Sequence, residues 1–266
     1  MQAGQQWLSG NSHKAPTSRY SPAERLAFSS RAPGGSVQQM RPAASLRIIS
    51  LFEELGDDEL VRISERCSTR TYDRNAQIMG ELDPPSDVFF ILRGTARANS
   101  ISPKGREVIY TELSAGDIVG EFSAIDGLPR SSAVFAVSEC VVARMPAKAF
   151  FELLRANGVV AAKLVELLVA KIRRMSERVF EVSALSVRER VRRELLRLAA
   201  TGERTGNRVT IKPAPTHYII AARIGSHREA VTREFNRLEA EKLLEVGRRE
   251  ISILDIEKLE DADDED

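Results

Sequence analysis

The spacing of apolar residues changes several times along the chain and divides it into segments of different character. Residues 1–45 carry no apolar period and are rich in Gln, Ser, Pro, Ala and Gly, which predicts a disordered extension. From 46 to 67, apolar residues recur every three or four positions, at Leu51, Phe52, Leu55, Leu60 and Ile63. This spacing predicts helix, interrupted by turn residues at 56–58.

Between residues 71 and 145 the pattern changes to short β-rich runs separated by turns. The runs lie at 88–92, 107–111, 133–137 and 140–143, and glycines recur between them every 11 to 14 residues. Many short strands with regularly spaced turns are typical of a small antiparallel barrel or jelly roll. Together with the preceding helical segment, this pattern predicts one β-roll domain over residues 46–157.

The longest helical pattern runs from 158 to 185. Seven apolar residues follow one another at alternating intervals of four and three, which is a heptad pattern: Ala161, Val165, Leu168, Ile172, Met175, Val179 and Val182. A helix of this length is ~40 Å long, more than a small barrel covers. We interpret the stripe as the interface between two copies of the helix in a homodimer; the alternative is that it packs against its own domain.

The segment 186–254 is predicted to contain helices and strands in the order of a winged helix-turn-helix. Gly225 separates two helices, of which the second opens with the capping-box pattern of Ser226 and Glu229. Two helices joined by a tight turn and followed by a hairpin are typical of that motif. The predicted elements are helices at 187–199, after Thr216 and from 226 to about 242, and strands at 209–211, 243–246 and 251–254, with a basic tip at 247–249.

Charge is distributed in opposed blocks that the net charge of +1 conceals. Residues 186–250 contain 15 Lys and Arg against nine Asp and Glu, a balance of +6, which indicates a nucleic-acid partner. Residues 255–266 contain eight acidic residues and one Lys, a balance of −7, and are predicted to be a disordered acidic tail.

Composition excludes several classes of protein. No stretch approaches the ~18 consecutive apolar residues of a membrane span, and no short apolar segment follows a basic start, so we expect a cytoplasmic protein. The Arg- and Ser-rich start also fits an organellar transit peptide, which is the alternative interpretation of residues 1–45. Cys67, Cys140 and the three histidines have no metal-binding spacing, so no metal is expected. No nucleophile–base pair or triphosphate loop indicates an enzyme.

One constellation has the chemistry of a nucleotide site. Gly120 and Glu121 open a predicted helical turn, where backbone N–H groups favour an anion. Arg130 follows nine residues after Glu121 and can bind a phosphate through two N–H groups, while Glu121 can accept a hydrogen bond from a sugar hydroxyl. The alternative is that Glu121 and Arg130 form an ion pair that fixes a loop.

These residues, Gly120-Glu121 with Pro129-Arg130-Ser131-Ser132-Ala133, closely resemble the phosphate-binding cassette of cyclic-nucleotide-binding domains. The turns at 93–94, 104–107 and 115–117 are similar to that family too. With the long helix and the winged helix-turn-helix, residues 48–254 resemble bacterial regulators of the catabolite activator protein (cyclic AMP receptor protein) and FNR superfamily, in its cyclic-nucleotide-binding branch. The resemblance implies an α+β fold: an N-terminal β-roll (jelly roll), a long dimerisation helix and a C-terminal winged helix-turn-helix.

The resemblance also implies the roles of individual residues. Arg130 and Ser131 would hold the cyclic phosphate, Glu121 the ribose 2′-hydroxyl, and Ser176 would reach the pocket of the partner subunit. The family has threonine where this chain has Met175, and a thioether is only a weak acceptor, so the choice between cyclic AMP and cyclic GMP stays open. The full set of expected cyclic-nucleotide-binding residues is Gly120, Glu121, Phe122, Arg130, Ser131, Ser132, Met175 and Ser176.

The second predicted helix of the helix-turn-helix carries the expected DNA contacts. Arg228 and Arg233 can each bind guanine N7 and O6, and Glu229 can accept from cytosine N4. The alternative is a solvated helix face with Arg–Glu pairs. The expected DNA-binding residues are Ser226, His227, Arg228, Glu229 and Arg233.

The sequence therefore predicts a homodimeric transcription regulator, an activator by resemblance, that responds to cyclic AMP or cyclic GMP. It would bind palindromic double-stranded DNA and RNA polymerase. The alternative is a regulator of the same fold that responds to a different small ligand or binds DNA constitutively.

Overall fold

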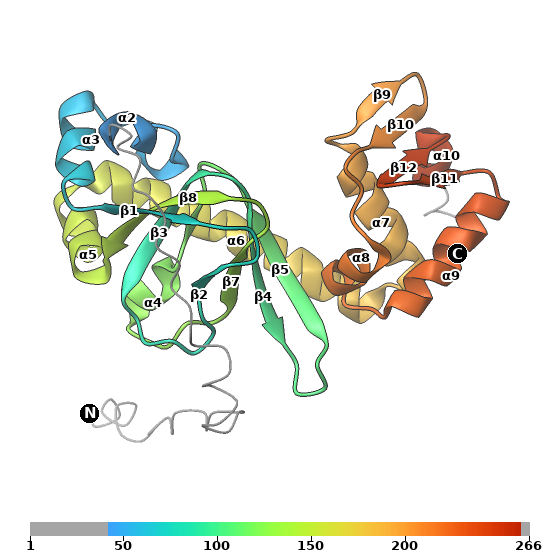
Figure 1. Ribbon diagram of the computed structural model, residues 1–266, viewed down its shortest axis with the longest axis horizontal. Helices are drawn as coiled ribbons and strands as arrows, with labels where there is room; N and C mark the ends of the chain where they lie inside the picture. Colours follow the sequence, from blue (N-terminus) through green and yellow to red (C-terminus); the bar gives the residue numbers. More distant parts are fainter. Residues whose placement is uncertain (1–41, 262–266) are drawn as a thin grey trace, which may run out of the picture. The chain divides into compact units, whose positions relative to one another are not determined.

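The structure, a computed structural model, describes residues 42–261, so residues 1–41 of the segment predicted to be disordered lie outside the described residues. Residues 42–45 were predicted to be disordered as well, but they form most of a short helix, α2 (Pro42–Leu46). The helical segment expected up to residue 67 contains two short pieces, η1 (Ser50–Phe52) and α3 (Asp57–Ser64) (Figure 1). Gly56 separates them and is the N-cap of α3, where its backbone N–H donates to Glu59 three residues on.

A β-roll of two four-stranded antiparallel sheets follows, as the regular glycine turns predict. One sheet has the strand order β1-β8-β3-β6 and the other β2-β7-β4-β5. Gly94, Gly105 and Gly116 each have a positive φ, which side chains with a Cβ rarely adopt. The strands are β1 (Ser68–Tyr72), β2 (Gln77–Met79), β3 (Asp87–Arg93), β4 (Ala96–Ile101), β5 (Glu107–Leu113), β6 (Ile118–Val119), β7 (Ala133–Ala136) and β8 (Cys140–Pro146).

Strand β3 separates two apolar cores of the roll. Residues on one of its faces, among them Val88 and Phe90, pack against the N-terminal helices, α5 (Ala147–Ala156) and the start of α6 (Gly158–Ala184). Residues on the other face, among them Phe89 and Ile91, belong to a core with residues of both sheets. This alternation is what a strand buried on both faces requires. The short helix α4 (Glu121–Asp126) lies between β6 and β7.

Helix α6 carries the heptad stripe, but its two halves have different surroundings. Asn157 caps its N-terminus by accepting hydrogen bonds from Val159 N and Val160 N at 3.1 Å. The first half packs against the core beside η1, and Leu168, expected in the dimer stripe, is partly buried there. Most apolar side chains of the stripe are nevertheless exposed, Val165 in the first half and Ile172, Met175, Val179 and Val182 beyond it.

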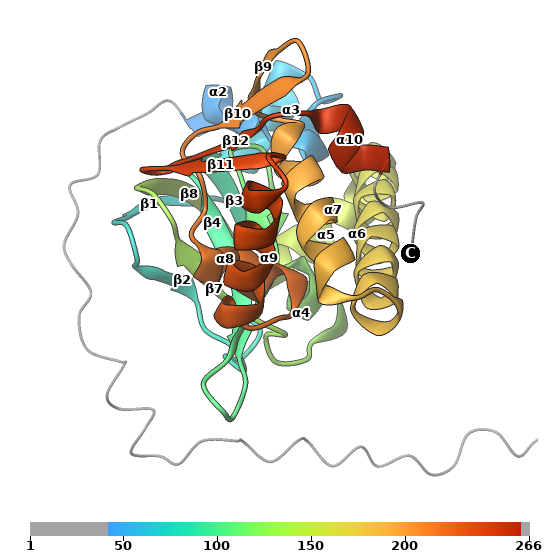
Figure 2. The same ribbon diagram turned by 90° about the vertical axis from the view of Figure 1, so that its right-hand side faces the viewer.

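The C-terminal domain is a four-stranded sheet with helices packed against it (Figures 1 and 2). Its sheet has the order β11-β12-β10-β9, and one apolar core joins sheet and helices. The sequence did not predict β9, whose three residues are all exposed. The elements are α7 (Val187–Ala199), β9 (Glu203–Thr205), β10 (Arg208–Ile211), α8 (His217–Ile224), α9 (Arg228–Ala240), β11 (Leu244–Gly247) and β12 (Glu250–Ile253).

The charge of the acidic segment from residue 255 predicts disorder, but part of this segment forms a helix. Residues 256–261 form α10 (Ile256–Asp261) (Figure 2). Ile256 and Leu259 are buried in the core of the C-terminal domain, so two apolar residues outweigh the surrounding charge. Residues 262–266 lie outside the described residues.

Candidate functional site

Arg130 is buried at the point where β3 meets the turn before α4. Its side chain is 1% exposed, and its guanidinium donates to Gly120 O at 2.7 Å, to Asp87 O at 2.5 Å and to Ser86 Oγ at 3.3 Å. The Nε atom of Arg130 is buried and has no hydrogen-bond partner. Burial lowers the pKa of Arg130, and nearby carboxylates, Asp87 first among them, oppose that effect. A buried cation with an unused donor has unfilled capacity for an acceptor.

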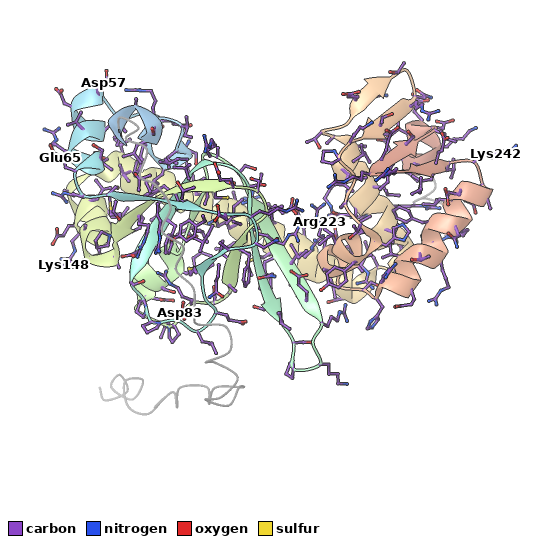
Figure 3. The ribbon with its side chains drawn as sticks, viewed as in Figure 1. Asp57, Glu65, Asp83, Lys148, Arg223 and Lys242 are labelled. Carbon is purple, nitrogen blue, oxygen red and sulfur yellow. The ribbon has the colours of Figure 1, made fainter. Side chains whose placement is uncertain are left out.

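Gly120 is required for this arrangement. Its φ is +89°, and a Cβ built on it would lie 2.8 Å from Arg130 Nη1 and 2.9 Å from Asp87 O. Any other residue here would collide with the guanidinium or with the backbone of β3. The turn between β2 and β3 holds Arg130 from the other side, because Asp83 O accepts from Arg130 N at 3.0 Å (Asp83 is labelled in Figure 3).

Glu121 is buried too, but it does not pair with Arg130. Its side chain bonds to Lys171 on α6, with Nζ 2.5 Å from Glu121 Oε1, and Lys171 also donates to Ile118 O at 3.1 Å. The ammonium group lies 5.6 Å from the centroid of the Phe122 ring. The alternative, an ion pair between Glu121 and Arg130, is therefore wrong, because each group has separate partners.

Lys171 is the residue that sequence reasoning missed. It lies 50 positions after Glu121, and the only signal along the chain was its place one helical turn before Met175, beside the apolar stripe. A buried carboxylate needs a counter-ion or donors, and this one is supplied by a different element.

The remaining expected ligand residues are less closely grouped. Ser132 is buried, Ser131 is exposed, and Phe122 is partly exposed beside Lys171. Met175 and Ser176 lie on α6, where they line a shallow hollow with Ile172 and Val179. Ser176 Oγ donates to Ile172 O within the same helix at 3.1 Å, so among the described residues its hydroxyl has no bond to the cassette.

The turn of the helix-turn-helix lies where it was predicted, but the residue that caps α9 differs from the predicted one. Thr216 caps α8 by accepting from Ile219 N at 3.3 Å, and Gly225 ends the helix with a φ of +64°. The capping box expected from Ser226 does not form: Ser226 is buried, and His227 is the N-cap of α9 without a side-chain hydrogen bond. Ser226 instead closes the end of α8, because its N–H donates to Ala221 O at 2.9 Å.

The side chains expected to contact bases lie on the open surface of α9. Arg228, Glu229 and Arg233 are all exposed in the first turns of the helix. The hairpin β11–β12 follows, with Arg248 and Arg249 in its turn. Figure 3 shows Lys242, just after α9, pointing away from the sheet.

Two family models match the chain in the order of these domains. The cyclic nucleotide-binding domain matches residues 69–157, and the Crp-like helix-turn-helix domain matches residues 189–262. The chain is 25% identical over 179 residues to the cAMP-activated global transcriptional regulator CRP of Haemophilus influenzae, covering 67% of this chain and 80% of that one. The chain belongs to the CRP/FNR superfamily.

The chain is also similar to a further regulator in sequence and to a solved structure in fold. The CRP-like cAMP-activated global transcriptional regulator of Mycobacterium tuberculosis is 22% identical over 210 residues, or 79% of this chain and 94% of that one. The c-di-GMP responsive global regulator CLP of Xanthomonas campestris has the same fold, with a TM-score of 0.67 and 16% identity over 74% of this chain and 99% of that chain.

As a member of the CRP/FNR superfamily, the chain is a DNA-binding transcription regulator with a cyclic-nucleotide-binding domain, and its relatives are regulators and not enzymes. Among residues 42–261, no helix is long and apolar enough to cross a membrane. In the same range, no group of His, Cys, Asp and Glu is arranged to hold a metal ion.

Proposed function

We propose that the protein is a homodimeric, cyclic-nucleotide-responsive transcription regulator. The proposal depends on the buried guanidinium of Arg130, whose Nε has no hydrogen-bond partner among the described residues. The adjacent Gly120 has room for no side chain larger than a hydrogen atom. A cyclic phosphate carries one negative charge and several acceptors, which match one buried cation and one unused donor. Cyclic AMP is the proposed ligand, with cyclic GMP as the competitor.

The other pocket residues have roles that follow from their chemistry. Ser131 and Ser132 supply hydroxyl groups beside the phosphate, and Glu121 accepts a hydrogen bond from the ribose 2′-hydroxyl. Lys171 already occupies one oxygen of Glu121, so the sugar must use the other oxygen or displace the ammonium group. Gly120 and Phe122 line the pocket, and Met175 and Ser176 face the base.

The second copy of the chain would cover the exposed stripe of α6. Ile172, Met175 and Val179 are each about 60% exposed, which is unusual for large apolar side chains in one row on a soluble protein. Two such helices packed side by side would bury both stripes and bring Ser176 of one copy toward the pocket of the other. The homodimer accounts for the stripe and for the position of Ser176 together.

Two recognition helices related by a dimer axis would meet a palindrome with half-sites about one turn of DNA apart. Arg228 and Arg233 would read guanine, Glu229 would read cytosine, and Ser226 and His227 would lie near the backbone. The expected place of action is the cytoplasm, with RNA polymerase as a partner in activation.

Calorimetric titration with cyclic AMP, cyclic GMP and 5′-AMP tests the ligand. Arg130→Ala should weaken cyclic-nucleotide binding by roughly 2–5 kcal/mol, because it removes the phosphate contact and leaves buried acceptors unpaired. Arg155→Ala is the matched control, since Arg155 lies on α5 and stacks over Phe151. Met175→Thr should raise the preference for cyclic AMP over cyclic GMP. Full affinity in Arg130→Ala would place the ligand elsewhere.

The ion pair between Lys171 and Glu121 favours a second candidate, a regulator that binds DNA constitutively or answers a different ligand. In that case the pair is a permanent link between α6 and α4. DNA affinity measured with and without cyclic nucleotide at fixed salt separates the two. A ligand-dependent increase supports the first candidate, and equal affinity supports the second.

A further inference from the structure

The imidazole of His217 joins the two helices of the helix-turn-helix. His217 is the first residue of α8, and its ring centroid lies 4.5 Å from that of Phe235 on α9. Its Nδ1 atom is 2.9 Å from Thr232 Oγ1, and Thr232 Oγ1 donates to Arg228 O at 3.0 Å. A threonine hydroxyl has a single hydrogen, which is used on Arg228 O, so Nδ1 of His217 is the donor to Thr232. A chain of hydrogen bonds thus runs from α8 to the first turn of α9.

We propose that His217 is a positioning residue for DNA reading: it holds the first turn of α9 and takes up a proton when the protein binds DNA. The proposal rests on the proposed role of α9 as the helix that reads bases. The Nδ1–H bond to Thr232 exists in the neutral and in the charged imidazole, so the proton is gained or lost at Nε2. Position and charge can therefore be tested separately.

The charged groups around the ring explain why DNA would promote protonation. Those acting on it from α9 are Arg228 and Glu239, and the adjacent titratable residue on α8 is Tyr218. Burial lowers the pKa of His217, the positive charge of Arg228 lowers it further, and Glu239 raises it. Phosphates that approach Arg228 would offset its repulsion and favour the imidazolium. By linkage, DNA affinity then rises as the pH falls through the range in which His217 titrates.

The experiment measures DNA affinity from pH 5.5 to 7.5 with the full-length protein, with and without saturating cyclic AMP. The probes are a duplex selected from a randomised library by the unmutated protein and a scrambled duplex of equal length. His217→Phe keeps a ring against Phe235 but loses the bond and the charge. His217→Gln keeps an amide donor and loses the charge, together with the ring that packs on Phe235. Tyr218→Phe is the matched control, because Tyr218 is the exposed neighbour of His217 on α8 and lies outside the chain of hydrogen bonds.

The unmutated protein should bind the selected duplex about threefold to tenfold more tightly at pH 5.5 than at pH 7.5, beyond any change seen in His217→Phe. His217→Phe should also lose about threefold to tenfold at pH 7.5 on the selected duplex, with little change on the scrambled one. His217→Gln should keep the affinity at pH 7.5 and lose the pH dependence, whereas Tyr218→Phe should keep both.

Two results would overturn the inference: an unchanged pH profile in both His217 variants, or loss of the profile in Tyr218→Phe. Arg228→Ala distinguishes this failure from failure of the proposed function. If Arg228→Ala binds the selected duplex as tightly as the unmutated protein, α9 does not read it and the proposed function is wrong at that point. If Arg228→Ala weakens binding and the His217 variants do not, only the inference about His217 fails.

Discussion

Arg130 and Glu121 are both buried polar groups, but the fold satisfies them in different ways. Arg130 donates to the carbonyl groups of Gly120 and Asp87 and keeps one donor unused, whereas the carboxylate of Glu121 is neutralised by Lys171 from α6. In the proposed pocket, the phosphate would thus meet an unused donor, and the sugar would meet a carboxylate that already has an ion-pair partner. Ligand affinity should depend on the strength of that pair.

Lys171→Met tests this dependence. Removing the ammonium group frees the oxygen that the ribose would use, so cyclic AMP should bind about threefold to tenfold more tightly. The free energy of unfolding should fall by about 1–3 kcal/mol, because Glu121 stays buried without its cation. Calorimetry and urea unfolding measure the two effects. Lys163→Met is the control. Lys163 lies on the same helix as Lys171, but it pairs with Glu53 after η1 and with Glu166, away from the proposed pocket. Unchanged ligand affinity in Lys171→Met would contradict the role.

For single residues, the sequence predicted patterns of neighbouring positions, but it did not predict contacts between residues that are far apart in the chain. Gly120, Glu121 and Arg130 lie within eleven residues, and their pattern led to the prediction of a phosphate site, which stays a prediction. Lys171 and the link from His217 to Thr232 depend on which faces of separate helices meet, which apolar spacing does not specify. The N-cap of α9 is His227, one residue after the predicted Ser226, because the N–H of Ser226 bonds to Ala221 O at the end of α8.

The helices and strands predicted most accurately are those with a long, regular pattern of apolar residues. The long helix and α7 were predicted nearly to the residue because their apolar stripes extend over many turns. Strands β1 and β9 were missed because almost all of their residues are exposed, so no alternation marks them. Strands β2, β4 and β6 were not among the predicted runs either, and β2 and β6 have only three and two residues. Helix α10 was missed because Ile256 and Leu259 are two apolar residues within a strongly acidic run.

Leu259→Ala tests whether α10 is part of the C-terminal core. Leu259 is fully buried, so losing its side chain should lower the free energy of unfolding by about 2–5 kcal/mol through lost burial and an added cavity. Urea unfolding followed by circular dichroism measures the change. Glu260→Ala, at the exposed neighbouring position, should change the stability by less than about 0.5 kcal/mol. Equal stability of the two variants would mean that α10 contributes nothing.

The turn of the hairpin β11–β12 should contact DNA without reading its sequence. Arg248 lies in that turn beside Arg249, whose backbone carbonyl accepts from Ala214 N and whose φ is +60°. Substituting Arg248 avoids this fixed backbone. Arg248→Ala should weaken selected and scrambled duplexes alike and reduce the slope of log affinity against log salt by about 1. A loss confined to the selected duplex would instead assign Arg248 to base reading.

For the whole molecule, α6 is the element that both functions share. Its first half packs on the β-roll, Lys171 bonds to the cassette, and α7 of the DNA-binding domain begins directly after its end. A nucleotide that changes the bond between Lys171 and Glu121 acts on the same helix that would form the dimer. Such differential contact is what a ligand needs to shift the balance between two arrangements of a protein.

The dimer is therefore the most consequential prediction for the whole molecule. Ile172→Asp with Val179→Asp places two charges in the exposed stripe, where a second helix would have to bury them, and should give monomers by sedimentation. Because both positions are exposed and lie outside the packed first half of α6, the β-roll should keep its fold. Glu177→Lys, on the polar side of α6, is the control and should stay dimeric.

The monomers should lose their preference for a palindrome over a single half-site, because one recognition helix remains where two acted together. Variants that still sediment as dimers would mean that another surface joins the two copies, and the stripe would then need a different partner.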